Sequence, residues 1–367
     1  MRRSNSILLA IFLCASIVLP VNAKAEEPVR RAIYVSLIQD PPVLSKLEDI
    51  LKLIEFSRES GIDDIFIQVY RANRSWFLSD SADSGPYIRC VNKMSEDPLD
   101  ALIKHAHDAG IKVHAWLNLL SLSANAEAPI LQKYGPEILT RNLQEKKAIE
   151  DYRIDNQYFL EPGDVRVRSE LAKVVYDLLS AYPGLDGIQF DYIRYPDQNP
   201  TYGYTDMNIE RFKRATGYSH VNENSGVWKD WKRKQVTELL NLLVRTTRAV
   251  RPDITVSVTG CASYIRAYYE AYQDWPYWLN SGLVDSVTFM SYTKDADRFK
   301  IYVYDAKALA NDFKKVNIAI GAYDMADSPP GFAKQIEIAK GSGASGFVIL
   351  HYGNLSENRE LAGLLKK

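Results

Sequence analysis

The regular alternation of short apolar segments with longer amphipathic segments is the feature that most constrains the fold of this chain. Eight apolar segments have the length and composition of β-strands: residues 32–37, 64–70, 111–118, 186–191, 254–260, 285–292, 317–323 and 346–352. Eight segments with helical periodicity alternate with them: residues 43–60, 98–110, 165–182, 227–250, 272–280, 305–315, 332–341 and 357–365. Strands that are separated by helices pair in parallel, and eight such units close into a barrel. The sequence therefore predicts a single α/β domain with the (β/α)8 fold, the TIM barrel.

The first residues of the chain have the pattern of a secretory signal peptide. A basic start is followed by an apolar run over residues 7–21 and by the sequence AKA at residues 23–25, which has the small-x-small form of a cleavage site. A membrane anchor is the alternative, but the run is short for a membrane span and Pro20 interrupts it. We therefore expect residues 1–25 to be removed and residues 26–367 to form the barrel domain. The mature protein is expected to be periplasmic or secreted, without stable membrane insertion.

Charge and cysteine content limit the partners expected for the mature chain. Removing the signal segment takes away Arg2, Arg3 and Lys24, so the formal net charge changes from −1 to −4. A mildly acidic chain with interspersed charges lacks a basic surface, so no nucleic-acid partner is expected. Cys90 and Cys261 remain after the signal, and in an exported protein they could form a disulfide or stay free. The oligomeric state stays open.

Alternation along the predicted strands separates an aliphatic face from a polar and aromatic face. In residues 186–191, Ile188 and Phe190 alternate with Gln189 and Asp191. Most of the other strands show the same division, whereas a barrel interior that only packed would be filled with Val, Ile and Leu. We therefore expect the polar set to point inward, toward an active site at the carboxyl ends of the strands. A polar interior satisfied by its own hydrogen bonds is the alternative.

The residues expected at these strand ends combine aromatic rings, amides, arginines and one carboxylate. This combination suits a carbohydrate, because aromatic faces stack on sugar rings, amide and guanidinium groups bind hydroxyls, and a carboxylic acid protonates a glycosidic oxygen. Asp191 is the candidate acid, and an ion pair with Arg194 is its alternative role. The candidate substrate-binding residues are Gln68, Tyr70, Arg71, Trp116, Asn118, Gln189, Arg194, Tyr292, Tyr323 and His351.

Other reaction classes find no support in the sequence. The histidines are scattered, and His105 and His107 are two residues apart on a predicted helix, so no zinc site is expected. There is no Gly-x-Ser-x-Gly nucleophile motif and no dinucleotide-binding fingerprint that follows a strand. The glycine-rich segment at residues 341–346 precedes a strand, which places it on the face opposite the active site and argues against a phosphate site. We therefore expect neither a metal nor a cofactor.

The segment DGIQFDYIRYP at residues 186–196 resembles the fourth-strand motif of the bacterial glycosyl-hydrolase-like family 10 and its relatives. Three further segments are similar to that family: residues 159–171, residues 272–292 and residues 346–355. The resemblance implies a secreted (β/α)8 glycoside hydrolase with Asp191 as its acid, acting on bacterial cell-wall glycan strands or amino-sugar exopolysaccharides. Many members of the family have two adjacent acids at this strand end, whereas this chain has Tyr192 in the second position.

A glycosidase normally uses a second carboxylate, about 5 Å from the first in retaining enzymes and about 6.5–9.5 Å from it in inverting enzymes. Asp295 is the best candidate for that role, and Glu161 and Asp324 are the alternatives. A weaker resemblance to the family 18 chitinases, carried by Met290 and Tyr292, suggests that the acetamido group of the substrate attacks instead. That mechanism needs no second acid.

Two functions therefore remain open at the level of the sequence. The first is hydrolysis of glycosidic bonds in a polysaccharide, with an amino-sugar polymer as the expected substrate. The second is a barrel that binds carbohydrate without cleaving it, which the missing acid at residue 192 favours. A phosphate- or metal-dependent hydrolase on the same fold is disfavoured, because the sequence offers no ligands for either group.

Overall fold

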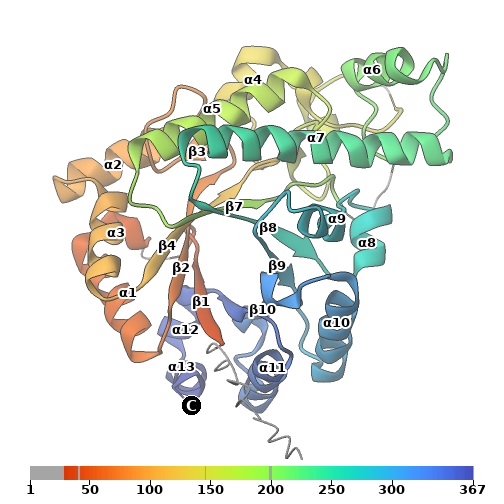
Figure 1. The fold of residues 1–367 in the computed structure, drawn as a ribbon. Helices are drawn as coiled ribbons and strands as arrows, with labels where there is room; N and C mark the ends of the chain where they lie inside the picture. Colours follow the sequence, from red (N-terminus) through yellow and green to blue (C-terminus); the bar gives the residue numbers. More distant parts are fainter. Residues whose placement is uncertain (1–28, 40–41, 145, 198–200, 367) are drawn as a thin grey trace, which may run out of the picture.

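The computed structural model describes residues 29–39, 42–144, 146–197 and 201–366 of the 367-residue chain, so the expected signal peptide lies outside the described residues. Parallel strands form a closed barrel, because β1 pairs with both β2 and β11 (Figure 1). In chain order these strands are β1 (Arg30–Val35), β2 (Asp64–Arg71), β4 (Lys112–Asn118), β7 (Gly187–Asp191), β8 (Thr255–Cys261), β9 (Ser286–Met290), β10 (Val316–Gly321) and β11 (Gly346–Leu350). The predicted (β/α)8 fold is confirmed.

Helices cover the outside of the barrel (Figure 1). Those in the predicted segments are α1 (Leu47–Glu59), α3 (Pro98–Asp108), α5 (Val165–Ala181), α7 (Gly226–Val250), α9 (Trp275–Asn280), α10 (Ala296–Leu309), α11 (Pro329–Gly341) and α13 (Arg359–Leu365). The helix predicted at residues 305–315 begins earlier, because Asp295 accepts hydrogen bonds from the backbone N–H groups of Asp297 and Arg298 and so caps α10. Within the described ranges, no helix combines the length and the apolar character needed to span a bilayer.

The connections that leave the carboxyl ends of the strands carry additional elements that were not predicted. Their helices are α2 (Gly85–Met94), α4 (Pro129–Tyr134), α6 (Asp206–Thr216), α8 (Tyr264–Tyr269) and α12 (Tyr352–Glu357). A short strand, β3 (Arg74–Ser75), folds back antiparallel on β2, and β5 (Ser121–Ser123) pairs with β6 (Tyr158–Phe159). These elements surround the mouth of the barrel, where active sites of this fold lie.

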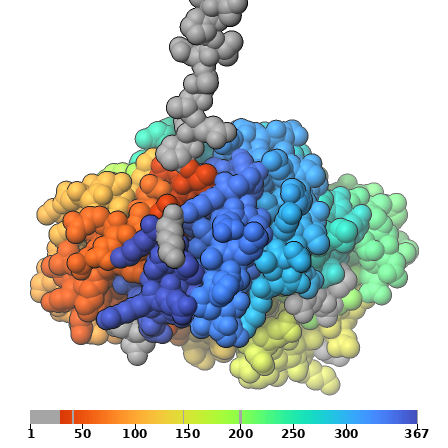
Figure 2. Space-filling view, turned by 90° about the horizontal axis from the view of Figure 1, so that it is seen from below, coloured from red at the N-terminus to blue at the C-terminus, as the bar shows by residue number. Residues whose placement is uncertain are grey.

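The two ends of the described chain meet where the barrel closes. β11 lies beside β1, and Arg31 Nη1 donates a hydrogen bond of 2.8 Å to the carbonyl oxygen of Leu365. In Figure 2 the C-terminal residues, in dark blue, lie against the red and orange N-terminal residues. The last helix therefore helps to fix the first strand.

The barrel separates two sets of side chains, as the alternation predicts. The outward set, which includes Ile188 and Phe190, is fully buried in one continuous core beneath the helices. The inward set includes Tyr34, Phe66 and Trp116, which form a separate cluster inside the barrel. The inside of the barrel is therefore lined by aromatic and polar groups.

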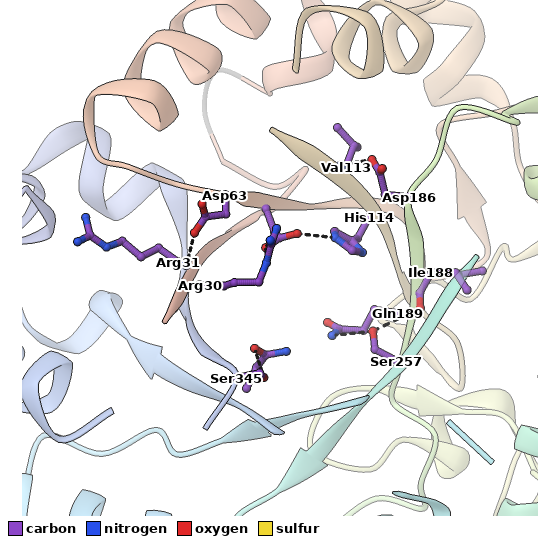
Figure 3. A network of polar contacts seen from close by, with 12 residues as sticks. Arg30, Arg31, Asp63, Val113, His114, Asp186, Ile188, Gln189, Ser257 and Ser345 are labelled. Atoms are coloured by element: carbon purple, nitrogen blue, oxygen red, sulfur yellow. Dashed lines mark hydrogen bonds and ion pairs between the residues drawn. The ribbon is translucent and has the colours of Figure 1, made fainter. Parts of the chain in front are cut away.

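A polar network closes the amino-terminal end of the barrel (Figure 3). Asp64 accepts hydrogen bonds from Arg30 Nε at 2.7 Å and from His114 Nε2 at 2.9 Å, which joins three neighbouring strands. Higher in the barrel, Gln189 Nε2 donates to Ser257 Oγ at 3.2 Å. These contacts lie below the mouth and serve the stability of the barrel.

Candidate active site

A cavity of about 510 Å3 opens at the carboxyl ends of the barrel strands. Predicted site residues that line it are Gln68, Arg71, Trp116, Asn118, Asp191, Arg194, Tyr292 and His351. Other lining residues include Tyr34, Ser36, Tyr192, Thr259, Cys261, Arg266 and Tyr302. The barrel therefore brings together strand ends that are far apart in the sequence and forms one polar and aromatic cavity from them.

Asp191, the last residue of β7, is only 5% exposed and three donors hold its carboxylate. Trp116 Nε1 donates to Oδ2 at 3.0 Å, and Thr259 Oγ1 donates to Oδ1 at 2.6 Å. The backbone N–H of Tyr192 donates to Oδ1 at 2.7 Å, from a left-handed conformation with φ of 56°. Because a carboxylate offers about four acceptor positions, Oδ2 keeps one for a proton or a ligand.

Arg194 lines the same cavity but forms its ion pair with a different acid. Its Nη1 lies 2.9 Å from Asp197 Oδ1, and Arg266 Nη1 lies 3.3 Å from Asp197 Oδ2. The guanidinium carbon of Arg194 also lies 4.7 Å from the centre of the Tyr192 ring. The structure therefore does not support the alternative in which Asp191 serves as the ion-pair partner of Arg194.

Two polar side chains offer the cavity an acceptor and a donor. Asn118 is 8% exposed, and its Oδ1 has no hydrogen-bond partner among the described residues. His351 Nδ1 accepts from the backbone N–H of Gly353 at 3.1 Å, and burial lowers the pKa of His351 below its ordinary value of 6.5. The ring is therefore neutral at neutral pH with its proton on Nε2, which acts as a donor.

The tyrosines around Asp191 are held in the phenol form. Burial, together with the charge of Asp191, raises the pKa of Tyr34 above its usual range. The pKa of Tyr292 rises for the same reasons, with Tyr34 as a further contributor. Both hydroxyl groups therefore keep their protons over the physiological pH range and add no negative charge beside Asp191.

Tyr70, predicted to line the site, lies instead in the outer core, where it is fully buried. The cause is a bulge in β2: Gln68 pairs with Trp116, whereas Tyr70 pairs with Leu117. A bulge inserts one residue and reverses the alternation that follows it. Tyr70 therefore points outward, and Arg71 enters the cavity.

Two further predicted residues lie beside the cavity and outside its lining. Gln189 is fully buried in the barrel, where it accepts a hydrogen bond from Tyr34 and donates to Thr288 Oγ1 at 2.9 Å. Tyr323 follows β10 and is 44% exposed, with its ring centre 5.9 Å from that of Tyr292 in an edge-on arrangement. Gln189 supports the cavity from below, and Tyr323 stands at its margin.

Asp191 is the only carboxylate among the described residues that line the cavity. Asp295, predicted as the second carboxylate, is exposed and caps α10 instead. Glu161 is fully buried, accepts a hydrogen bond of 2.5 Å from the Tyr195 hydroxyl, and has its pKa raised by burial. Asp324 is exposed after β10. None of the three candidates lines the cavity with Asp191.

Thr259, Arg266 and Tyr302 line the cavity although they were not predicted as site residues. Thr259 belongs to the inward face of β8, so the alternation that selected Asp191 could have selected it too. Arg266 and Tyr302 lie on α8 and α10, and no sequence pattern places those helices at the mouth.

The described cysteines and possible metal ligands form neither a disulfide nor a metal site. Cys90 and Cys261 are both free and buried, so they do not form the disulfide that an exported protein could have carried. Among the residues with described positions, no group of three or more His, Cys, Asp and Glu side chains could hold a metal ion.

Comparison with known proteins relates the sequence of the chain to a glycosyl hydrolase-like family. The glycosyl hydrolase-like 10 family matches residues 38–324. Glycosyl hydrolase DigH of Escherichia coli K12 is 22% identical over 287 residues, which cover 72% of this chain and 61% of DigH. Glycosyl hydrolase YngK of Bacillus subtilis 168 is 20% identical over 380 residues, which cover 92% of this chain and 71% of YngK. The chain thus spans less than two thirds of the length of DigH.

Solved structures share the fold at very low sequence identity. The catalytic domain of β-amylase from Paenibacillus polymyxa has a TM-score of 0.60 and 12% identity, with 92% of this chain and 96% of that chain covered. The α-galactosidase from Lactobacillus brevis has a TM-score of 0.53 and 11% identity, with 93% of this chain and 40% of that chain covered. These likenesses show the barrel fold alone. Because the family match covers most of the chain, the protein belongs to the glycosyl hydrolase-like 10 family.

Proposed function

We propose that the protein is an exported glycoside hydrolase that cleaves an amino-sugar polymer, such as a peptidoglycan glycan strand or an exopolysaccharide, with Asp191 as general acid. The observation that carries this proposal is the position of Asp191, the only carboxylate among the described residues that line the cavity at the mouth of the barrel. Membership in a glycosyl hydrolase-like family supports it. Export is inferred from the signal pattern of residues 1–25.

In the proposed reaction, Asp191 gives a proton from Oδ2 to the glycosidic oxygen, and the leaving sugar departs as an alcohol. The carboxylate that remains is stabilised by the same three donors, from Trp116, Thr259 and Tyr192. No second carboxylate lines the described cavity, so in this proposal the carbonyl oxygen of the substrate's own acetamido group attacks the anomeric carbon. Water then opens the cyclic intermediate and returns a proton to Asp191.

The polar groups of the cavity suit a sugar. The buried Oδ1 of Asn118 needs a donor, and the amide N–H or a hydroxyl of an amino sugar supplies one. The indole of Trp116 and the rings of Tyr192 and Tyr292 give the cavity aromatic surfaces against which sugar rings stack. Polysaccharide is therefore the proposed partner, and the proposal includes neither nucleic acid nor cofactor.

The test compares residues 26–367 of the wild type with the Asp191→Asn variant. Each is incubated with chitin oligomers, with de-N-acetylated glucosamine polymer and with peptide-stripped peptidoglycan strands, and the products are identified by mass spectrometry. Asp80→Asn serves as the matched control, because Asp80 is exposed and lies outside the cavity lining.

We expect the wild type and Asp80→Asn to cleave an acetylated glycan, and Asp191→Asn to lose at least about a thousandfold in rate. Cleavage of the de-N-acetylated polymer at an equal rate would exclude attack by the acetamido group. Binding of a glycan by both proteins with cleavage by neither would show the alternative function, a carbohydrate-binding barrel without hydrolysis.

A further inference from the structure

A second cavity of about 530 Å3 adjoins the one that contains Asp191. Ile38 and Arg71 belong to the linings of both cavities, so the two share a wall. The second cavity is formed by the β2–β3 hairpin, by Ser123 at the end of β5 and by residues 124–127, which lie between β5 and α4. The two cavities are therefore neighbours.

The hairpin places two arginines side by side on the wall of this second cavity. Arg71 of β2 pairs directly with Arg74 of β3, and the two residues between them, Ala72 and Asn73, both adopt the left-handed conformation of a tight hairpin turn. Directly opposed residues on antiparallel strands point to the same face, and like charges in that position are destabilising. The pair is therefore unfavourable unless anions lie against it, and the protein supplies one of them, Asp83, beside Arg74.

Among the described residues, one acid forms an ion pair with this arginine pair. Arg74 lies 3.6 Å from Asp83 in an exposed contact, whereas Arg71 forms no ion pair within the described residues and contacts Ser123 Oγ at 3.4 Å. Glu127 is the one carboxylate in the described lining, and it accepts a hydrogen bond from Gln132 at 3.2 Å. The described lining carries two positive charges and one negative charge, and Asp83, outside the lining, offsets the charge of Arg74. Arg71 is therefore the cation that lacks an acidic partner among the described residues.

The walls that carry the two arginines are fixed before any ligand binds. Asn73 Nδ2 donates to the Tyr70 hydroxyl at 3.1 Å and to the carbonyl of Ser81 at 2.8 Å, and its Oδ1 accepts from the backbone N–H of Ile130 at 3.0 Å. Asn125 Nδ2 donates to the carbonyl of Ala72 at 2.8 Å, which ties the hairpin to the opposite wall. Such pre-organisation lowers the entropy cost of binding.

An aromatic ring completes the lining. Trp76 follows β3 and is half-buried, and it packs against the hydrophobic core while also lining the second cavity. A ring that is supported on one side and open on the other is a platform for a sugar ring. Trp76 and the arginine pair together match a pyranose ring that carries an acidic substituent.

We propose that the second cavity is a binding subsite for a carboxylate-bearing sugar of the glycan whose bond is cleaved at Asp191. Trp76 stacks on the sugar ring, and Arg71 and Arg74 bind the carboxylate through charge-assisted hydrogen bonds. The identity of the ligand as a glycan rests on the function proposed above. The carboxylate belongs either to a lactyl ether on an amino sugar or to a uronic acid, since both present the same group beside a pyranose ring.

The test measures binding by calorimetry, with hydrolysis recorded separately. The ligands are peptide-stripped peptidoglycan strands, which carry lactyl ethers, hyaluronan oligomers, which carry uronic acids, and chitin oligomers, which are neutral. The proteins are the wild type, Arg74→Gln, Arg74→Lys and the control Arg58→Gln, which removes a charge from an exposed position on α1. The Asp191→Asn background is used for any ligand that the wild type consumes.

We expect the wild type to bind one of the acidic glycans at least about tenfold more tightly than the neutral oligomer, with an advantage that shrinks at high salt. Arg74→Gln should remove most of that advantage, Arg74→Lys should restore part of it, and Arg58→Gln should leave it in place. The acidic ligand that is preferred identifies the source of the carboxylate. Equal affinity for acidic and neutral glycans, or an Arg74→Gln protein with unchanged preference, would overturn the proposal. If the wild type hydrolyses none of the glycans but still binds an acidic glycan more tightly than the neutral one, the proposed reaction is rejected and the proposed subsite is not.

Discussion

At the scale of single residues, hydrogen bonds position Asp191, and it forms no ion pair with any residue that the structure describes. A carboxylate buried at the end of a strand is costly unless its oxygens are satisfied. Hydrogen bonds from Trp116, Thr259 and the backbone of Tyr192 satisfy them. Arg194 forms its ion pair with Asp197 instead. Thr259 is therefore a positioning residue, because it contacts Asp191 Oδ1 at 2.6 Å.

Replacing Thr259 by Val keeps the shape of the side chain and removes this hydroxyl donor. We expect kcat to fall about tenfold with little change in KM, because a positioned acid is worth most in the transition state. Stability should fall by about 1 kcal/mol, the usual cost of one lost hydrogen bond. Thr259→Ser should restore kcat, and Thr255→Val, at the opposite exposed end of β8, should leave it unchanged. Equal kcat for Thr259→Val and wild type on the same glycan would exclude the positioning role.

At the scale of elements, the β2–β3 hairpin joins the two cavities and depends on an unusual turn residue. Ala72 has φ of 55°, in the left-handed region where a side chain is disfavoured by about 1–2 kcal/mol. Asn73, the other turn residue, tolerates that region and is held by three side-chain hydrogen bonds. Ala72 is thus the strained residue of the turn.

Replacing Ala72 by Gly should stabilise the protein by about 0.5 kcal/mol, because relief of the left-handed strain exceeds the added freedom of the unfolded chain. Thermal unfolding checks this expectation. Ala310→Gly is the matched control, since Ala310 has φ of −93°, and it should be destabilising by about 0.5 kcal/mol. Loss of stability in Ala72→Gly equal to that in the control would show that the left-handed turn carries no strain.

The same hairpin shows how far the sequence could predict the site. Strict alternation along the strands predicts that Gln68, Trp116 and Asp191 point into the cavity, and all three line it. In a strand without a bulge, every second side chain points inward. The bulge in β2 depends on how two strands pair, which no local pattern records, so the inward position predicted for Tyr70 was wrong. The same lack of a local signal explains why Arg71 lines the cavity although strict alternation would point it outward.

The strands were predicted because their composition is locally distinctive, whereas the elements between them are set by tertiary contacts. β9 ends at Met290, and the chain then turns, so the alternation no longer applies to Asp295. The short helices α4, α8 and α12 have six residues each, too few to be stable alone, and they exist because they pack around the mouth. The fold could therefore be predicted from periodicity, and the rim of the site could not.

At the scale of the whole molecule, the barrel is closed at its amino-terminal end by the Arg30–Asp64–His114 network. Burial is the largest single influence on the pKa of Asp64 and raises it. The hydrogen bond and charge of His114, together with the charge of Arg30, outweigh burial and lower the pKa of Asp64 below its ordinary value of 3.8. The unfolded chain therefore binds the proton first as the pH falls. The stability contributed by this group is present above about pH 4 and is lost as the pH falls through the folded-state pKa.

Replacing Asp64 by Asn should lower the free energy of unfolding by about 2 kcal/mol at pH 7, because charge-assisted hydrogen bonds to two partners are weakened. The difference from the wild type should shrink below pH 4, where the wild-type carboxylate also becomes protonated. Urea unfolding followed by tryptophan fluorescence between pH 3 and pH 7 measures both proteins. Asp80→Asn changes the net charge equally at an exposed position and corrects for general charge effects. If the free energies of unfolding of Asp64→Asn and wild type differ by the same amount across that range, the charge of Asp64 does not contribute to the stability of the barrel.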